Sequence, residues 1–273
     1  MTVFETAKKT VISAKNSGAD AIKLQTYTAD TITLNTNKED FRINQGTIWD
    51  GKLLYDLYKE AYTPWEWHKE IFDLAKELDL LCFSSPFDHS AVDFLETLDC
   101  PIYKIASFEI TDIPLISYVA SKRKPIIIST GIAQHEDICL AVEACKKQGN
   151  TDITLLKCTS SYPAPIEEAN ISLMQQIAKD FKVKVGLSDH TMGSTLPIIA
   201  TALGASVIEK HFILDRSIGG PDASFSMNER EFSEMVKQIR AAEKSIGSTS
   251  YKLSKKQEEA KAFSRSLYIS KEI

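Results

Sequence analysis

Two histidines occupy matching positions in successive strand-like segments of the chain. His190 lies at the end of the first segment, in GLSDHT. His211 follows 21 residues later near the end of the next segment, VIEKHF, about one strand–helix repeat further on. In a barrel of parallel strands such positions lie side by side on the face where barrel enzymes do their chemistry. Imidazole is a common ligand for divalent transition metals, and two histidines leave coordination positions for water and a substrate oxygen. The pair predicts an open catalytic metal site, with two ordinary core histidines as the alternative.

Lysines within apolar segments point to a second kind of chemistry. Lys23, Lys104 and Lys210 lie in strand-like runs, where a buried ammonium is costly unless it is paired or functional. Other polar groups collect at the ends of these runs and their neighbours: Ser107, Glu109, Ser129, Thr159, Ser160, Tyr162, Asp189 and Glu209. Together they predict a site for a phosphorylated anion beside the metal. Any single lysine could instead point outward into solvent.

The remaining histidines and the cysteines carry weaker signals. His68 and His135 lie in helix-like stretches and are expected on the surface. His89 follows a strand end, so it either lines the site or belongs to the polar start of a helix. Neither an HExxH motif nor a cysteine–histidine zinc pattern occurs, which argues against a closed structural metal site. Five cysteines without CxxC spacing are typical of reduced core thiols.

The elements that would position these groups alternate regularly along the chain. Strand-like runs cover 21–25, 80–85, 102–106, 125–130, 153–158, 184–189 and 207–212. Helical periodicity covers 4–18, 66–78, 88–98, 112–122, 135–148, 170–181, 194–203 and 228–246. Runs that are apolar on both faces and alternate with helices indicate parallel strands buried between helices.

This order of elements predicts an α/β fold of the (β/α)8 TIM-barrel type that lacks its first strand, because a helix precedes the first of seven strands. An open doubly wound sheet is the alternative, but no glycine-rich dinucleotide fingerprint follows the first strand. One connection, from Thr26 to Pro64, is unusually long and contains only one short helix-like stretch at 53–61. Long loops usually carry function, so we expect this one beside the site rather than as a surface decoration.

Composition limits the classes of partner. A net charge of −5 and a pI near 5.6 give no general attraction to nucleic acid or to anionic membranes. No apolar run approaches the roughly 20 residues that a membrane span needs, and the first residues contain no signal-peptide core. We therefore expect a cytoplasmic protein whose partners are small molecules.

The ordered motifs resemble those of the nonulosonic (sialic) acid synthase family over nearly the whole chain. They are KLQTY, SSPFD, KIASFEITD, ISTGIA, KCTSSYPAP, GLSDHT, EKHFILDR and GGPDASFSM. The loop sequence GTIWDGKLLYDLYKEAYTPWEWH is similar to the pseudaminic acid branch of that family. The resemblance implies a barrel enzyme that makes acids for cell-surface glycans, such as those of glycosylated flagellin.

In that branch the resemblance implies condensation of phosphoenolpyruvate, 2,4-diacetamido-2,4,6-trideoxy-L-altrose and water to pseudaminic acid and phosphate. It also implies a divalent metal cofactor, Mn²⁺ by preference, with Mg²⁺ or Co²⁺ as alternatives. N-acetylneuraminate synthesis, legionaminate synthesis, and a remnant that only binds metal or phosphoenolpyruvate remain alternatives.

The family roles can be carried over to matching positions. His190 and His211 match the metal ligands, and Glu209 and Lys104 are the expected catalytic groups. The expected substrate-binding residues are Lys23, Ser107, Ser129, Thr159, Ser160, Tyr162, Asp189 and Asp222. Since Glu209 precedes His211 by two residues, both side chains should lie on one strand face.

The ends of the chain depart from the family pattern. The family has a first strand with a glutamate motif before the opening helix, and a C-terminal antifreeze-like domain that reaches the partner subunit of a homodimer. We therefore expect residues 1–250 to form an incomplete barrel domain and 251–273 to be a linker. A barrel without one strand has two unpaired edges, so we expect little or no synthase activity from this exact chain.

Overall fold

A computed structural model describes residues 2–44, 46, 49–265 and 267. Its centre is a parallel sheet of seven strands in the order β1 to β7. The strands are β1 (Ala21–Thr26), β2 (Leu81–Pro86), β3 (Tyr103–Ile105), β4 (Ile126–Ser129), β5 (Ile153–Cys158), β6 (Lys184–Asp189) and β7 (Val207–Lys210). Each strand lies within two residues of its predicted bounds, which confirms the seven-strand prediction.

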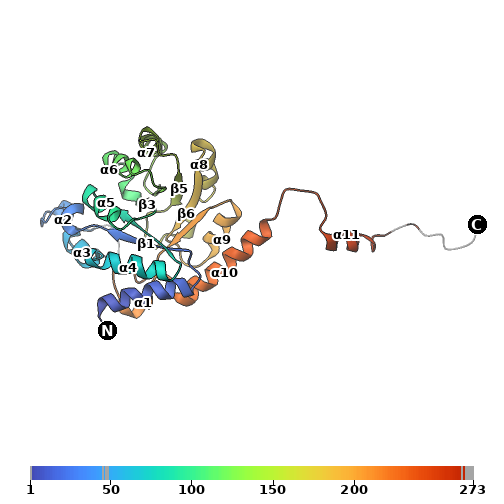
Figure 1. The fold of residues 1–273 in the computed structure, drawn as a ribbon, viewed down its shortest axis with the longest axis horizontal. Helices are drawn as coiled ribbons and strands as arrows, with labels where there is room; N and C mark the ends of the chain where they lie inside the picture. The colour runs from blue at the N-terminus through green and yellow to red at the C-terminus, as the bar shows by residue number, and fades with distance from the viewer. Residues whose placement is uncertain (1, 45, 47–48, 266, 268–273) are drawn as a thin grey trace, which may run out of the picture.

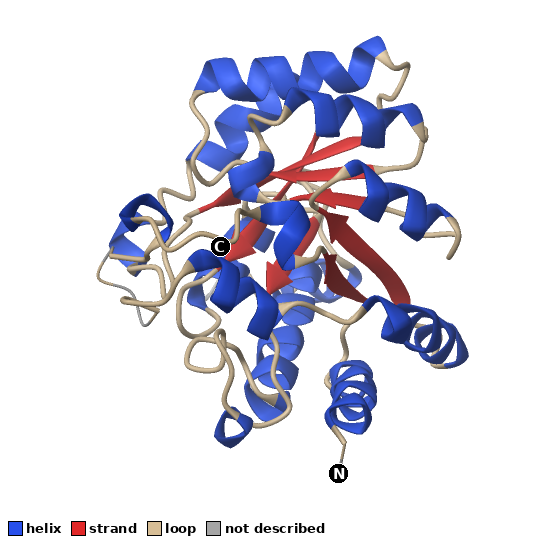
Figure 2. Cartoon of the chain, turned by 90° about the vertical axis from the view of Figure 1, so that its left-hand side faces the viewer, coloured by secondary structure: helices blue, strands red, loops and turns tan. Residues whose placement is uncertain are grey.

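Helices surround the sheet on its outer side (Figures 1 and 2). Along the chain the helices are α1 (Val3–Asn16), α2 (Ala29–Ile32), α3 (Leu54–Ala61), α4 (Trp65–Glu77), α5 (His89–Glu96), α6 (Ile113–Ser121), α7 (His135–Lys147), α8 (Leu173–Phe181), α9 (Thr195–Ala202), α10 (Glu229–Ile246) and α11 (Lys255–Lys261), the last of which lies apart from the sheet. Short 3-10 turns are η1 (Glu39–Phe41), η2 (Ser107–Glu109), η3 (Ile166–Glu168) and η4 (Arg216–Ile218). The sheet curls as in TIM-type barrels, so the predicted fold class is confirmed.

Side-chain caps fix where several helices begin. At the start of α5, Asp88 accepts hydrogen bonds from the backbone amides of Ser90 and Ala91. At the start of α10, Asn228 and Glu231 form a reciprocal capping box. Such caps satisfy amides that have no partner within the helix. They place each helix directly after the loop that follows a strand, and these loops carry the polar groups of the site.

The core follows from the apolar strands. Ile105, Ile128 and Leu155 are fully buried in the largest apolar cluster, where β3, β4 and β5 pack against their helices. The outermost strands β1 and β7 differ, because most of their residues are only partly buried. Within the described part of the chain, no backbone ladder joins β1 to β7. We call the interval between these two strands the seam.

Helices α1 and α10 pack against each other along the outside of the seam. The Ser13 hydroxyl of α1 donates to the carboxylate of Glu229 at the start of α10. The Arg240 guanidinium pairs with Asp20, which immediately precedes β1. The first and last elements of the body are therefore joined through side chains.

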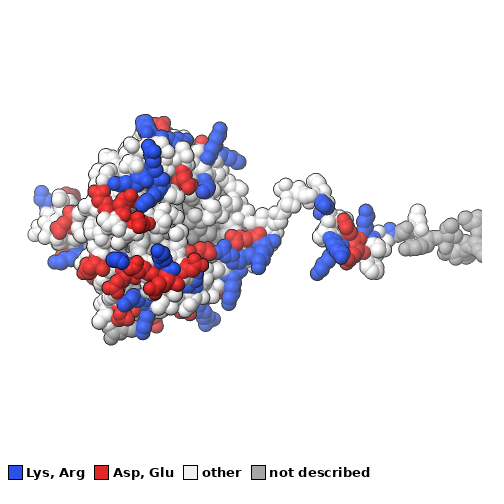
Figure 3. Space-filling view, in the orientation of Figure 1, with Lys and Arg blue, Asp and Glu red and all other residues white. Residues whose placement is uncertain are grey.

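Beyond α10 the chain leaves the body as an extended segment that includes α11 (Figure 1). Its described side chains are exposed, and those of Tyr251 and Phe263 are almost fully so. Residues 266 and 268–273 of the predicted linker lie outside the described residues. Acidic and basic side chains are interspersed on the face of the molecule in Figure 3. None of the described helices is both long enough and apolar enough to cross a membrane.

Candidate active site

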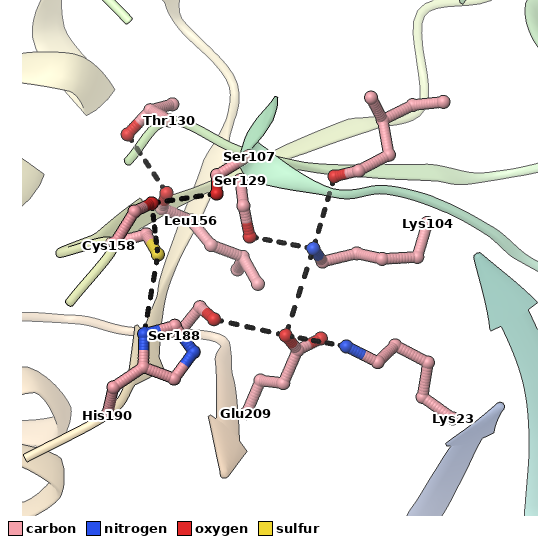
Figure 4. A network of polar contacts seen from close by, with 12 residues as sticks. Lys23, Lys104, Ser107, Ser129, Thr130, Leu156, Cys158, Ser188, His190 and Glu209 are labelled. Carbon is pink, nitrogen blue, oxygen red and sulfur yellow. Dashed lines mark hydrogen bonds and ion pairs between the residues drawn. The ribbon is translucent and has the colours of Figure 1, made fainter. Parts of the chain in front are cut away.

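Three charged side chains meet inside the barrel (Figure 4). The Glu209 carboxylate lies 2.9 Å from the Lys23 ammonium and 3.7 Å from that of Lys104, and it accepts a hydrogen bond from Ser188. Burial alone would raise the pKa of Glu209, but the charges of Lys104 and Lys23 outweigh this and hold its pKa well below the usual range. Glu209 of β7 is therefore an anion held between two cations, Lys23 across the seam on β1 and Lys104 on β3.

Lys104 is the buried cation of this group, with 1% of its surface exposed. Its ammonium donates to the Ser129 hydroxyl at 2.7 Å and to the carbonyl of Ile105 at 3.1 Å. Burial lowers the pKa of Lys104 to about 8, although the charge of Glu209 opposes the shift. The lysine therefore changes charge near neutral pH.

Hydroxyls from neighbouring loops lie beside this lysine. Ser107 and Ser160 share a hydrogen bond of 2.8 Å between their hydroxyl oxygens. Gly131 leaves room for them, because a Cβ atom at this position would lie 2.0 Å from the Ser160 hydroxyl oxygen. An ammonium surrounded by hydroxyls is suited to an anion with several acceptor oxygens, such as phosphate. These groups line a cavity of about 1490 Å³, which also extends along the seam.

The two predicted metal ligands lie together on the cavity wall. The ring centroids of His190 and His211 are 5.2 Å apart, close enough for both to reach one ion at bond lengths of about 2.1 Å. His190 Nδ1 lies 2.8 Å from the carbonyl oxygen of Thr159, which can only accept. His190 therefore donates through Nδ1 and keeps Nε2 free as a lone-pair donor. His211 Nδ1 lies 3.2 Å from the Asp222 carboxylate.

This donor set fits a divalent metal with open coordination positions. Burial lowers the pKa of His190 to about 4, so its imidazole is neutral, as a metal ligand must be. Bonds from ligand histidines to a carbonyl or carboxylate are the usual supporting contacts of such sites. Within residues 2–44, 46, 49–265 and 267, no group of three or more histidine, cysteine or acidic side chains could hold a metal.

The other predicted substrate residues divide into two groups. Tyr162 lines the cavity, with its ring 4.4 Å from that of His190, and Asp222 lines it as well. Asp189 is instead buried in an ion pair of 2.6 Å with Lys210, and Thr159 contributes its carbonyl rather than a hydroxyl that lines the cavity. The structure therefore brings neither the Asp189 carboxylate nor the Thr159 hydroxyl to the cavity.

Among the other histidines, the surface prediction for His68 is wrong. His68 is fully buried, and its Nε2 lies 2.8 Å from the hydroxyl of Thr26, which also contacts Ser84 at 2.7 Å. His135 is exposed, as expected. His89 stacks on Tyr118 and does not line the cavity, which leaves the helix-start interpretation.

Glu109 is a cavity residue that the sequence placed among the polar strand-end groups without a specific catalytic or binding role. It lies in η2, two residues after Ser107, and lines the cavity. Its Oε2 atom is buried and has no hydrogen-bond partner in the protein. Burial raises the pKa of Glu109 to about 7, where a carboxyl group can both accept and donate protons. The signal in the sequence that could have given Glu109 a role was its position two residues after Ser107, a predicted phosphate ligand.

The long connection between Thr26 and Pro64 lies against the cavity, in agreement with the functional expectation. Tyr27, Trp49 and Tyr58 from this segment all line the cavity. The Trp49 indole NH donates to the carbonyl of Pro221 at 3.2 Å, which ties the loop to the segment after β7. The loop therefore forms one wall of the site.

Known proteins resemble this chain in sequence. The chain is 51% identical over 268 residues to a pseudaminic acid synthase of Helicobacter pylori, an alignment that covers 98% of this chain and 78% of the relative. It is 48% identical to a pseudaminic acid synthase of Campylobacter jejuni, with 99% and 78% covered. An N,N'-diacetyllegionaminic acid synthase of Legionella pneumophila is 39% identical, with 90% and 70% covered.

A solved structure and a family model lead to the same grouping. The crystal structure of an N-acetylneuraminic acid synthetase from Leptospira borgpetersenii superposes with a TM-score of 0.84 at 28% identity, covering 95% of this chain and 86% of that one. The model of the NeuB family matches residues 10–251. With this match over most of its length, the chain belongs to the NeuB family.

Proposed function

We propose that the protein is a synthase that condenses phosphoenolpyruvate with 2,4-diacetamido-2,4,6-trideoxy-L-altrose and water, giving pseudaminic acid and inorganic phosphate. The observation that carries the proposal is one cavity holding both the Lys104–Ser129 anion site and the His190–His211 pair. The identity of about 50% to pseudaminic acid synthases, against 39% to a legionaminic acid synthase, favours the altrose derivative.

Phosphoenolpyruvate would bind at the cationic end of the cavity. Lys104 and the hydroxyls of Ser107, Ser129 and Ser160 hold the phosphate, while Lys23 pairs with the carboxylate. Such charge-assisted hydrogen bonds position the substrate without any nucleophilic residue. The same contacts stabilise the phosphate as it leaves.

The sugar aldehyde would approach the histidine pair. His190 and His211 would hold the divalent ion, Mn²⁺ by preference with Mg²⁺ or Co²⁺ as alternatives, which supplies Lewis-acid polarisation of the sugar carbonyl when bound. Asp222 orients His211, and the Thr159 carbonyl orients His190. These two supports hold the orientation of the imidazole rings.

The reaction forms one carbon–carbon bond and breaks one carbon–oxygen bond. C3 of phosphoenolpyruvate attacks C1 of the aldehyde, whose oxygen takes up a proton to become a hydroxyl, and C2 becomes electron-deficient. Water adds at C2 with loss of a proton, and the adduct then expels phosphate to leave the 2-keto acid. Glu209, fixed as an anion between two lysines, stabilises positive charge near C2 and orients the water. Glu109 has the pKa that suits proton transfer, about 7.

Separate incubations with phosphoenolpyruvate, Mn²⁺ and one aldose at a time, each followed by mass detection of the product, test the proposal. The panel of aldoses holds the precursors of pseudaminic, legionaminic and N-acetylneuraminic acids. Pseudaminic acid formed from the altrose derivative supports the function and overturns the low activity expected from the unpaired strand edges. Another product would move the chain to the corresponding branch.

Metal content and a phosphoenolpyruvate titration separate the remaining alternatives. Binding of both ligands without turnover of any aldose supports a protein that only binds them. A chain that binds neither ligand contradicts the proposed site.

A further inference from the structure

A buried ion pair joins the two strands that lead to the histidine pair. The Lys210 ammonium lies 2.6 Å from the Asp189 carboxylate, and the two side chains are almost fully buried, with 2% and 0% of their surfaces exposed. A buried ion pair is weak evidence for added stability, because each charge has to leave water when the protein folds. The position of this pair in the fold is therefore the better guide to its role.

The pair lies at the end of the backbone ladder between β6 and β7. Asp189 and Lys210 are the last residues that face each other in this ladder, and each directly precedes one of the two histidines. The backbone carbonyls of His190 and His211 accept hydrogen bonds from amides in other segments of the chain. In the part of the chain that the structure describes, the backbone pairing of β6 and β7 therefore stops one residue before each histidine.

Lys210 also holds the residues that follow His190. Its ammonium donates to the Asp189 carboxylate, to the carbonyl of Thr191 and, at 3.2 Å, to the carbonyl of Gly193. The other carboxylate oxygen of Asp189 accepts from the Thr191 amide at 2.8 Å. His190 therefore lies between two residues that are both bonded to Lys210.

These contacts occupy the charged groups of the pair. A lysine ammonium has three donors, and Lys210 has three acceptors within the protein. Each carboxylate oxygen of Asp189 also has a donor. A substrate or a metal ion could bind either group only by replacing one of these contacts. The pair is therefore suited to hold the backbone beside the histidines.

We propose that the Asp189–Lys210 ion pair is a positioning device that keeps His190 and His211 at the separation that one divalent ion requires. This role rests on the proposed function, in which the two imidazoles hold the ion. The ring centroids are 5.2 Å apart, and the groups of a functional site have to be held to within about 0.5 Å. Since the ladder ends before the histidines, side-chain contacts have to supply this precision, and the ion pair links the residues directly before both.

Mn²⁺ binding to the full chain tests the inference without turnover. The test variant combines Asp189→Asn, which keeps an acceptor for the Thr191 amide, with Lys210→Met. Because the pair has one positive and one negative charge, the net charge near the histidines is unchanged, and a loss of affinity reports geometry. We expect Mn²⁺ affinity, measured by electron paramagnetic resonance of the free ion, to fall by about tenfold or more, as it does when a supporting contact of a metal ligand is lost.

A second ion pair on β6 supplies the matched control. Lys184, at the other end of β6, pairs with Asp152 at 3.1 Å. Lys184→Met combined with Asp152→Asn removes the same two charges from the same strand and should leave Mn²⁺ affinity unchanged. Phosphoenolpyruvate affinity, measured calorimetrically without metal, should stay at the wild-type value in both double variants.

Wild-type Mn²⁺ affinity in the Asp189→Asn, Lys210→Met variant overturns the inference. An equal loss of phosphoenolpyruvate affinity in that variant also overturns it, because the barrel as a whole would then be disturbed. If circular dichroism shows that the variant does not fold, Asp189→Glu replaces it, since it keeps both charges but displaces the ammonium by one methylene group. Lower Mn²⁺ affinity in Asp189→Glu supports the inference, and unchanged affinity overturns it.

Failure of the proposed function gives a different result. A wild-type chain that binds no Mn²⁺ contradicts the proposed metal site itself. Mn²⁺ binding that survives His190→Ala does the same, whatever the ion-pair variants show.

Discussion

Lys23 and Glu209 form an ion pair of 2.9 Å between the first and last strands of the sheet, β1 and β7, which share no backbone ladder. The two side chains are about four-fifths buried, so solvent screens their attraction less than it would at the surface. The pair therefore does two things at once. It spans the seam, and it fixes a cation and an anion where phosphoenolpyruvate is proposed to bind.

Phosphoenolpyruvate affinity should fall as the pH rises through about 8. The phosphate needs the ammonium form of Lys104, whose pKa burial lowers to about 8. Affinity is therefore full below this pH and is lost above it, by about tenfold for each further pH unit. Calorimetric titration across this range measures the effect.

Glu209→Gln serves as the matched variant for that titration. Its lost charge no longer raises the pKa of Lys104, so the midpoint should move to lower pH. Lys104→Met should bind weakly at every pH. An affinity that stays constant across the range would exclude Lys104 as the phosphate ligand.

Mn²⁺ binding should depend on both His190 and His211, and on Asp222, which orients the His211 ring. His190→Ala and His211→Ala should each abolish measurable binding, while Asp222→Asn should weaken it by about 10- to 100-fold, as loss of a supporting contact does. Electron paramagnetic resonance of free Mn²⁺ reports the bound fraction. His135→Ala, an exposed histidine, is the control. Wild-type affinity in either histidine variant would remove the pair from the metal site.

Gly131→Ala should disturb the anion site through steric contact. The new Cβ would lie 2.0 Å from the Ser160 hydroxyl oxygen and 3.1 Å from Cβ of Ser107, so the two serines must move apart. We expect phosphoenolpyruvate affinity to fall by about tenfold, the value of one or two misplaced hydrogen bonds to a charged group. Removing the hydroxyl in the double variant with Ser160→Ala should restore part of the thermal stability but not the affinity. Unchanged phosphoenolpyruvate affinity in Gly131→Ala would show that Ser107 and Ser160 do not contact the ligand.

His68→Ala should lower the free energy of unfolding by about 3 kcal/mol, because it leaves a cavity and removes a partner from a buried hydroxyl. Urea denaturation followed by circular dichroism gives the value. His135→Ala should stay within about 0.5 kcal/mol of the wild type, as surface substitutions do. A His68 variant as stable as the control would mean that the Thr26–His68 contact contributes nothing.

The fold could be predicted closely because its signal is local. Apolar, β-branched runs such as 125–130 and 153–158 are strands wherever they are buried between helices. The matching positions of His190 and His211 on successive strands also follow from this periodicity, and the structure places the rings together. Most of the site residues predicted from their positions at strand ends therefore line one cavity.

The rest depended on contacts that no local pattern records. His68 was expected on the surface, yet it lies on the buried face of α4 with Ile71 and Ala75, where Thr26, 42 residues earlier, pairs with it. Asp189 and Lys210 are strand-end groups by sequence, but the register of β6 and β7 sets them opposite each other, where they pair. Glu109 was one of the polar strand-end groups by sequence, but its buried, unpartnered oxygen at the cavity is visible only in the structure. In each case the partner of a side chain, or the lack of one in the described protein, decided its role.

The charged contact across the seam also links ligand occupancy to the width of the barrel. Six strand interfaces are held by backbone hydrogen bonds that no small molecule can compete for, whereas β1 and β7 are connected through Lys23 and Glu209. A substrate carboxylate that binds Lys23 would compete with Glu209 for the same ammonium group. Substrate binding and added salt should therefore both weaken the Lys23–Glu209 ion pair, a charged contact between β1 and β7 in the described part of the chain.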